Sequence, residues 1–242
     1  MAAVGLRFFV AAQIDTETRG APITYKKGMR LGPARAANVT FERNSDPLYG
    51  DDVIQDNDNG ITGGTIDTES TQMTSAERVY ILGEEAVTGA DNEFDGSDAA
   101  SPYVGNGYFR VLREKDLSTG VVSTIYEAWW FHKVQFSENN INAATREGRI
   151  AWQTPQINGR MMGVYIDASG KARFFRRATF NSEGGAIAWL LGKANMAAAY
   201  DATKTYALGD YCIKEGVPYI CISAIATAEA WTAAHWAAVT TM

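Results

Sequence analysis

Residues that could do acid–base, nucleophilic or metal chemistry are few in this 242-residue chain. It has two histidines, His132 and His235, and two cysteines, Cys212 and Cys221. The sequence contains no H-E-x-x-H metal motif, no G-x-S-x-G nucleophile motif and no Walker loop. The cysteine pair with His235 would still lack a fourth zinc ligand. We therefore expect no enzyme, no metal and no cofactor, and we predict that His132 is a core or interface residue.

Carboxylates gather in two stretches, and the first one raises the question of a calcium site. Counting from Gly60, Gln55 and Ile66 stand where an EF-hand loop needs acidic residues. The stretch over residues 91–101 likewise lacks its late glutamate. We interpret both as solvated loops, and we expect Asn44–Gly64 to act in assembly because compact domains seldom keep so long a loop without a function. Its acidic residues include Asp51, Asp52, Asp56 and Asp58.

A small basic cluster, Arg173, Arg176 and Arg177, stands out in a chain of net charge −6. Two interpretations stay open: a contact to acidic loops of a neighbouring subunit, or a solvated strand face. Single exposed ion pairs contribute little, often under about 1 kcal/mol, so charge alone does not decide between them. The acidic balance argues against a protein that binds nucleic acid through its phosphates.

The elements that must position these residues are mostly strands. In the run Ser123–Phe136, one alternate set of residues is apolar apart from His132, which indicates a core face. The other set is apolar only at Trp129 and Phe131, so either a helix or another subunit must cover that patch. Further strands are expected at Val4–Ile14, Tyr25–Leu31, Val39–Arg43, Thr65–Thr71, Tyr108–Arg113 and Arg149–Met162, and a hairpin at Val164–Ile166 with Ala172–Arg177.

Two short helices complete the expected elements. Thr74 and Glu77 have the spacing of a capping box and Gly83 is a natural stop, which predicts a helix over Ser75–Leu82. This helix is a good candidate to cover the Trp129 patch. A second, apolar helix is expected over Ala186–Leu191, ended by Gly192. The sequence thus predicts a mainly β fold with a short helix.

Several sequence blocks also carry a family resemblance. The blocks are PYVGNGYFRVLR, EAWWFHKVQFSE and WQTPQING in the centre, with Val4-Gly5-Leu6 and Leu48-Tyr49-Gly50-Asp51-Asp52 before them. Their order and spacing over residues 1–190 resemble the major tail protein family of long-tailed bacteriophages. The resemblance implies a tail-tube β-sandwich or barrel whose subunits form hexameric rings. It also implies that the rings stack into a hollow tube.

Composition shifts near Lys193–Ala199, where a second module begins. Residues 198–240 resemble the small chitinase-type carbohydrate-binding module through Tyr200, Tyr206, Gly209-Asp210, Gly216, Tyr219, Trp231 and Trp236. We therefore predict a tail-tube domain over 1–195 and a small β-module over 199–242. Tyr206 and Trp236 are expected to be structural, and Trp231 and Tyr211 are the candidates for stacking on a sugar.

We compare three candidate functions for this chain. The first is a virion structural protein, assembled in the host cytoplasm, whose partners are further copies of itself, tape-measure and terminator proteins, DNA passing through the lumen, and cell-surface glycans. The second is a carbohydrate-binding adhesin or decoration protein. The third, an uncharacterised hydrolase, has no supporting motif. No apolar run is long enough to cross a membrane, and Val4–Ile14 lacks the basic start and cleavage site of a signal peptide, so we expect no membrane insertion.

Overall fold

The computed structural model describes residues 2–50, 53–88, 93–96, 98, 100–138, 141 and 154–240, and it confirms a mainly β fold with short helices. The helices are α1 (Ser75–Leu82), α2 (Glu183–Lys193) and the 3₁₀ turn η1 (Ala233–His235). The strands are β1 (Ala2–Thr16), β2 (Thr24–Tyr25), β3 (Met29–Arg30), β4 (Ala34–Arg43), β5 (Asp46–Gly50), β6 (Val53–Asp58), β7 (Ile61–Ser70), β8 (Glu85–Ala86), β9 (Phe94–Asp95), β10 (Tyr103–Lys115), β11 (Val122–Ser137), β12 (Gln156–Met161), β13 (Phe175–Phe180), β14 (Ala197–Ala199), β15 (Tyr211–Lys214), β16 (Val217–Cys221) and β17 (Trp236–Ala238).

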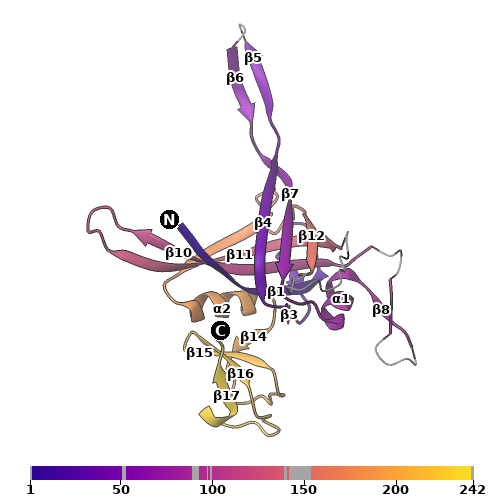
Figure 1. The fold of residues 1–242 in the computed structure, drawn as a ribbon, viewed down its shortest axis with the longest axis vertical. Coiled ribbons are helices and arrows are strands. Elements are labelled where there is room, and N and C mark those ends of the chain that lie inside the picture. Colours follow the sequence, from indigo (N-terminus) through magenta and orange to yellow (C-terminus); the bar gives the residue numbers. More distant parts are fainter. Residues whose placement is uncertain are drawn as a thin grey trace, which may run out of the picture.

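One nine-stranded sheet forms the body of the molecule. Its order is β2-β1-β10-β11-β12-β7-β4, with β3 added beside β1 and β13 beside β11. All of its pairings are antiparallel. The long strands β10 and β11 form its centre, and their far ends extend as a hairpin beyond the other strands (Figure 1).

Each face of this sheet carries a buried core, and a bulge in β11 divides the side chains of that strand between the two cores. Between the pairs Val104–Val134 and Asn106–Phe131, β11 carries one residue more than β10. Such a bulge shifts the alternation of side chains. Trp130 therefore packs in the core beneath α2, whereas Phe131 and Val134 both pack in the core on the opposite face. The expectation of one unbroken core face along Ser123–Phe136 is wrong for this reason.

Helix α1 confirms its sequence signature in detail. It begins at Ser75, the Thr74 hydroxyl accepts from the Glu77 N–H, and the Glu77 carboxylate accepts from the Thr74 N–H at 2.8 Å. It ends at Gly83, which has a left-handed φ of 79°. Ile81 is buried in the same core as Phe131, so the helix does cover part of that face.

Helix α2 is longer than expected. It runs from Glu183 to Lys193, so Gly192 lies inside it rather than ending it. The Ser182 hydroxyl caps its first turn by accepting from the Gly185 N–H. At the other end, the chain turns at Asn195, which has a φ of 52°. The predicted glycine stop is wrong because an asparagine supplies the left-handed residue three positions after Gly192.

The stretch Asn44–Gly64 is not a loop, and that prediction is wrong. Strands β4 and β7 continue through the Asn44 N–H, which donates to the Gly60 carbonyl at 2.9 Å, into the paired strands β5 and β6. The result is a two-stranded arm that projects from the body (Figure 1). Polar composition misled the prediction because a strand with solvent on both faces needs no apolar alternation.

The C-terminal residues form a separate four-stranded sheet in the order β14-β15-β16-β17. It lies against α2, so the helix is packed between the body and the small sheet (Figure 1). Glu215 and Gly216, with φ values of 53° and 79°, make the tight turn between β15 and β16. This turn pairs Cys212 with Tyr219 rather than with Cys221, and both cysteines are free thiols.

The remaining strands differ from prediction mainly in length. Tyr25–Leu31 holds only the two-residue strand β3 with the end of β2, whereas β4 begins five residues before Val39. Strand β12 covers Gln156–Met161 of the predicted strand Arg149–Met162, and residues 149–153 lie outside the described residues. Of the hairpin predicted over Val164–Ile166 and Ala172–Arg177, one bridge between Val164 and Arg173 forms, and from Phe175 the chain pairs with β11 instead.

Candidate assembly surfaces

The arm formed by β5 and β6 projects from the body (Figure 1). Within the described residues, β5 and β6 pair with each other and with no other strand. An isolated two-stranded ribbon is at best marginally stable in water. Both strands also present edges that can pair with another chain. The arm is therefore suited to a contact with a neighbouring molecule.

The predicted ring-stacking residues belong to this arm. Asp51 and Asp52 lie outside the described residues, and Asp56 lies on β6. Asp58 ends β6, where its two carboxylate oxygens accept from the Gly60 N–H at 3.1 Å and from the Asn44 amide at 3.2 Å. Asp58 thus fixes the base of the arm, and its role as a stacking contact stays a prediction.

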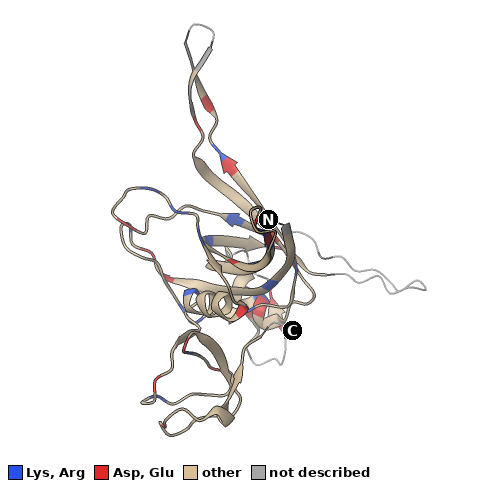
Figure 2. Cartoon of the chain, turned by 90° about the vertical axis from the view of Figure 1, so that its left-hand side faces the viewer, with Lys and Arg blue, Asp and Glu red and all other residues tan. Residues whose placement is uncertain are grey.

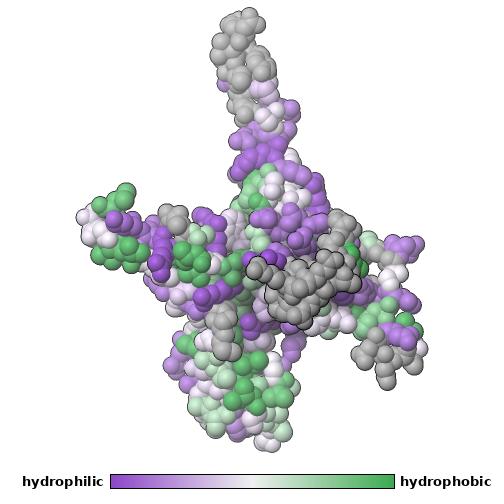
Figure 3. Space-filling view, in the orientation of Figure 1, coloured by the Kyte–Doolittle hydropathy of each residue, from purple (hydrophilic) through white to green (hydrophobic). Residues whose placement is uncertain are grey.

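A second projecting feature is the tip of the β10–β11 hairpin. Leu117, Val121 and Val122 there are 95%, 62% and 57% exposed. They form an apolar tip on a ribbon whose flanks are polar (Figure 3). Three exposed aliphatic side chains on one turn are costly in water, and burial against another protein would remove that cost. The sequence pattern did not predict this site. The adjacent Val121 and Val122 after the turn are the feature that could have indicated it.

Glu127 lies at the centre of a charged and aromatic cluster on β11. Its side chain is 4% exposed and lies 2.5 Å from the Arg110 guanidinium and 3.0 Å from that of Arg177. The Trp129 indole N–H donates to the same carboxylate at 2.9 Å. Burial by itself would raise the pKa of Glu127, but the bond from Trp129 and the two arginine charges outweigh it and lower the pKa.

This cluster bears on the predicted subunit interface, which included Trp129 and Phe131. Phe131 is fully buried in the core of its own subunit, so its assignment to a subunit interface is wrong. The rings of Tyr108, Trp129 and Phe175 lie 6.0, 6.1 and 6.3 Å from that of Phe131, and Phe41 packs on Phe175 at 5.2 Å. Trp129 is half-buried beside them, at the margin that Arg110 and Arg177 cover.

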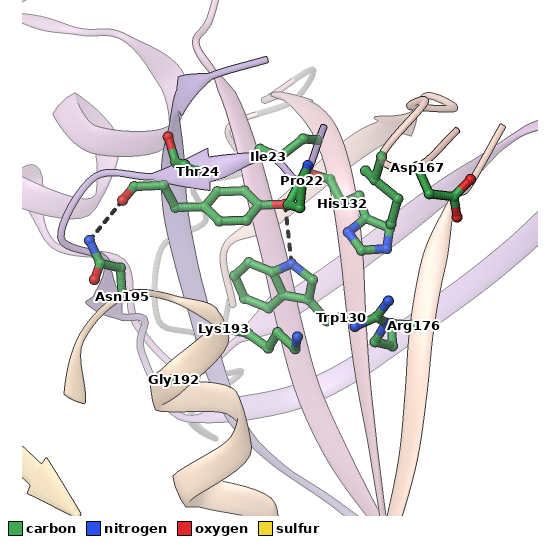
Figure 4. A pocket seen from close by; sticks show the side chains of 12 residues that line it. Pro22, Ile23, Thr24, Trp130, His132, Asp167, Arg176, Gly192, Lys193 and Asn195 are labelled. Atoms are coloured by element: carbon green, nitrogen blue, oxygen red, sulfur yellow. Dashed lines mark hydrogen bonds between the residues drawn. The ribbon is translucent and has the colours of Figure 1, made fainter. Parts of the chain in front are cut away.

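The three predicted arginines do not act as one patch. Arg173 pairs with Asp167 at 3.2 Å, and Arg177 pairs with Glu127. Arg176 instead lines a pocket with His132 and Lys193 (Figure 4). Across the described part of the chain, basic and acidic residues are mixed along the ribbon rather than gathered in one basic stripe (Figure 2).

The aromatic residues of the C-terminal module build its core. Trp236 is buried, and Tyr200, Tyr206 and Trp231 pack around it, which confirms structural roles for Tyr206 and Trp236. Trp231 is half-buried: it stacks on Trp236 at 5.3 Å, and the Lys214 ammonium lies over its ring at 4.8 Å. A sugar stacking on Trp231 would have to displace Lys214.

Tyr211 lies on the other face of the small sheet. It pairs with Ile220 and packs with it against the α2 core, whereas Cys212 and Tyr219 face the Trp231 side. Tyr211 and Trp231 therefore cannot bind one sugar together. Each remains a separate candidate, and Tyr211 is half-buried in the junction with the body.

The described ranges contain no group of three or more metal-ligating side chains. No helix among these residues is long and apolar enough to cross a membrane. Comparison with known proteins adds no assignment: no protein-family model matches the sequence, and no curated protein matches it either.

Proposed function

We propose that this chain is the subunit of a virion tail tube of a long-tailed bacteriophage. Its copies would assemble into stacked rings, which the family resemblance implies are hexameric. Tape-measure and terminator proteins would be its other tail partners. The proposal is supported first by the ordered sequence blocks over residues 1–190.

The observation that carries the proposal is the arm of β5 and β6. Its strands find no partner in the body within the described residues, although the body is otherwise well packed. Ordering such a ribbon costs conformational entropy that its intramolecular contacts do not offset. Contacts with the next copy would offset that entropy cost. The exposed apolar tip of the β10–β11 hairpin offers a second contact of the same kind.

DNA in the lumen of such a tube must slide rather than bind. A net charge of −6 suits that requirement, because tight non-specific binding depends on neutralising phosphates with lysine and arginine. We expect assembled tubes to show no measurable DNA affinity at physiological salt.

The test is to remove the arm without disturbing the sheet. Deleting residues 46–58 with Ser45→Asn and Asn59→Gly would close β4 and β7 by an Asn-Gly turn, which suits a two-residue hairpin. We expect a folded subunit that forms no rings or tubes in negative-stain microscopy, whereas the wild type forms them. The two substitutions without the deletion are the control. Tubes of normal length from the shortened protein would overturn the role of the arm.

The alternative function, a carbohydrate-binding adhesin, rests on the C-terminal module. It predicts a monomer that binds immobilised glycans and loses that binding in Trp231→Ala. In the tube proposal the same module is displayed on the outside, where many copies would turn weak glycan contacts into avid ones. Gel filtration separates the two, because only the tube proposal requires assembly.

A further inference from the structure

A pocket of about 530 Å³ lies where the C-terminal end of α2 meets the sheet (Figure 4). Five segments line it: the chain around β2, strand β11, the chain at Ile166 and Asp167, strand β13 and the end of α2. The side chains that matter are Tyr25, Trp130, His132, Arg176, Lys193 and, at the rim, Asp167. None of these was predicted to share a site, because the pairing of β11 with β13 and the packing of α2 bring them together.

Two of these side chains place like charges in one small space. Arg176 and Lys193 point toward one another (Figure 4), and burial, followed by the charge of Arg176, lowers the pKa of Lys193. Within the described residues, neither cation has a carboxylate within 4.0 Å. Two such charges repel each other, and an anion bound between them would offset that repulsion.

The neighbouring negative groups are already engaged. Asp167 pairs with Arg173 and accepts from the Ser169 N–H at 2.9 Å. The carbonyl end of α2 is also capped, since the N–H groups of Ala194 and Met196 donate to the carbonyls of Leu190 and Leu191. Neither group is therefore free to neutralise the two cations.

His132 forms the inner end of the pocket. The β11 bulge places His132 there, and this residue is 7% exposed. Its backbone is held on both sides, since its N–H donates to the Phe174 carbonyl at 3.0 Å and its carbonyl accepts from the Tyr25 hydroxyl at 2.8 Å. Burial, with the charges of Arg176 and Lys193, lowers the pKa of His132 to about 4, so its ring is neutral at pH 7.

An aromatic wall completes the pocket. The Trp130 indole N–H donates to the Tyr25 hydroxyl at 3.3 Å, so the polar atoms of these two rings already have partners (Figure 4). Trp130 itself is fully buried, so the apolar surface open to a ligand comes from the half-buried Tyr25 and Ile23. The pocket thus combines two cations, a neutral imidazole and an apolar wall.

We propose that this pocket binds a carboxylate carried on a short organic stem, with Arg176 and Lys193 pairing the carboxylate and Tyr25 contacting the stem. A guanidinium and an ammonium both donate strong, charge-assisted hydrogen bonds to a carboxylate. The aromatic wall and the nearby Asp167 charge disfavour a small dianion such as phosphate. The carboxylate has two sources: an acidic side chain of a second copy of this chain, or a free carboxylic acid. The proposal does not depend on the tail-tube function.

The two histidines make the test direct, because His132 and His235 give separate imidazole signals in NMR spectra. Adding butyrate to the full chain should shift the His132 signal to saturation and raise the pKa of His132, because the bound anion offsets the two cations. The His235 signal should not move. Phosphate should act more weakly.

Variants assign the effect to the two cations. Arg176→Gln and Lys193→Gln should each weaken butyrate binding by roughly tenfold or more, the usual loss for a charge-assisted hydrogen bond. Lys171→Gln, an exposed change in the preceding turn, is the matched control and should bind as the wild type does. No saturable shift of His132, or an equal shift in the doubly substituted protein, would overturn the proposal.

Sedimentation of the same proteins distinguishes the two sources. If a neighbouring copy supplies the carboxylate, Arg176→Gln should weaken self-association and butyrate should compete with it. If the ligand is a free acid, self-association should be the same with and without butyrate, while the His132 shift persists. Either result supports the site and names its occupant.

Discussion

At the scale of single residues, Glu127 is a buried charge held by three partners. Its carboxylate joins two strands, because Arg110 lies on β10 and Arg177 on β13. It also satisfies the indole N–H of Trp129. A buried donor left without an acceptor costs about 1–3 kcal/mol. The negative charge of Glu127 therefore stabilises the fold. The guanidinium groups of Arg110 and Arg177 remain exposed, so they stay available for contacts in an assembly.

We expect Glu127→Gln to lower the free energy of unfolding by about 1–3 kcal/mol at pH 7. The pKa of Glu127 is lowered in the folded protein, so its ionised form stabilises the fold above the unfolded pKa. That contribution is lost as the pH falls through the folded pKa. Urea unfolding at pH 7 and pH 3 should thus show a smaller pH effect in the variant. Glu114→Gln on β10 is the control, and an unchanged pH effect in Glu127→Gln would contradict the prediction.

His132 makes a second prediction at this scale, with a different pH window. Its pKa falls from 6.5 to about 4 on folding, so the unfolded chain takes up a proton that the folded chain does not. Stability should be fully present above pH 6.5 and should decline as the pH falls toward 4, by on the order of 3 kcal/mol. His132→Gln should remove this decline, whereas His235→Gln should keep it. Equal profiles for wild type and His132→Gln would show that the imidazole is not shielded from protonation.

At the scale of elements, α1 shows how local chemistry sets a boundary. Its first turn is closed by side chains at both ends of the capping box, and its last by a left-handed glycine. These devices need no tertiary partner, which is why the sequence predicted both ends correctly. The helix then contributes Ile81 to the core that also buries Phe131.

Thr74→Ala should destabilise the protein by about 1 kcal/mol, the usual cost of losing an N-cap hydroxyl. Thermal unfolding followed by circular dichroism would measure it. Ser75→Ala, one position later and exposed, removes a hydroxyl that caps nothing and should leave the melting temperature unchanged. Equal losses from both substitutions would mean that the capping bond contributes nothing.

At the scale of the whole molecule, the C-terminal module is docked rather than tethered. Ile220, Tyr211 and Val239 join the core around α2, and Lys27 pairs with Asp210 across the junction at 2.7 Å. The module nevertheless keeps its own aromatic core around Trp236. Removing it would expose the outer face of α2, so truncation at Ala198 tests the junction as well as display on the outside of a tube.

A substitution inside the junction separates docking from folding. Val239 is 8% exposed, and Val239→Asp would place a charge without a partner in the α2 core. We expect urea unfolding to split from one transition into two, with the module retaining its own transition because the Trp236 core is untouched. Thr240→Ala, an exposed neighbour, should unfold as the wild type does. Loss of the module's transition together with docking would show that it does not fold by itself.

The sequence by itself determined features whose cause is local: the α1 boundaries, the Glu215-Gly216 turn, the turn around Asp167 and the strand character of the central stretch. Each follows from backbone preference or from hydrogen bonds within a few residues. The sequence also indicated that Tyr206 and Trp236 are structural, since a small module must bury its aromatics. The resemblance to tail-tube proteins, and the function drawn from it, remain proposals.

Only the tertiary structure decided the features that depend on distant partners. The β11 bulge divides one apolar strand between two cores, and no local pattern at His132 or Lys133 announces it. The arm extends β4 and β7 in a sequence whose polar residues resemble a loop. Phe131 is covered by Phe175, and Arg176 meets Lys193, because sheet register and the packing of α2 bring together residues far apart in the chain. Cross-strand and helix–sheet contacts are set by global packing, which local spacing does not encode.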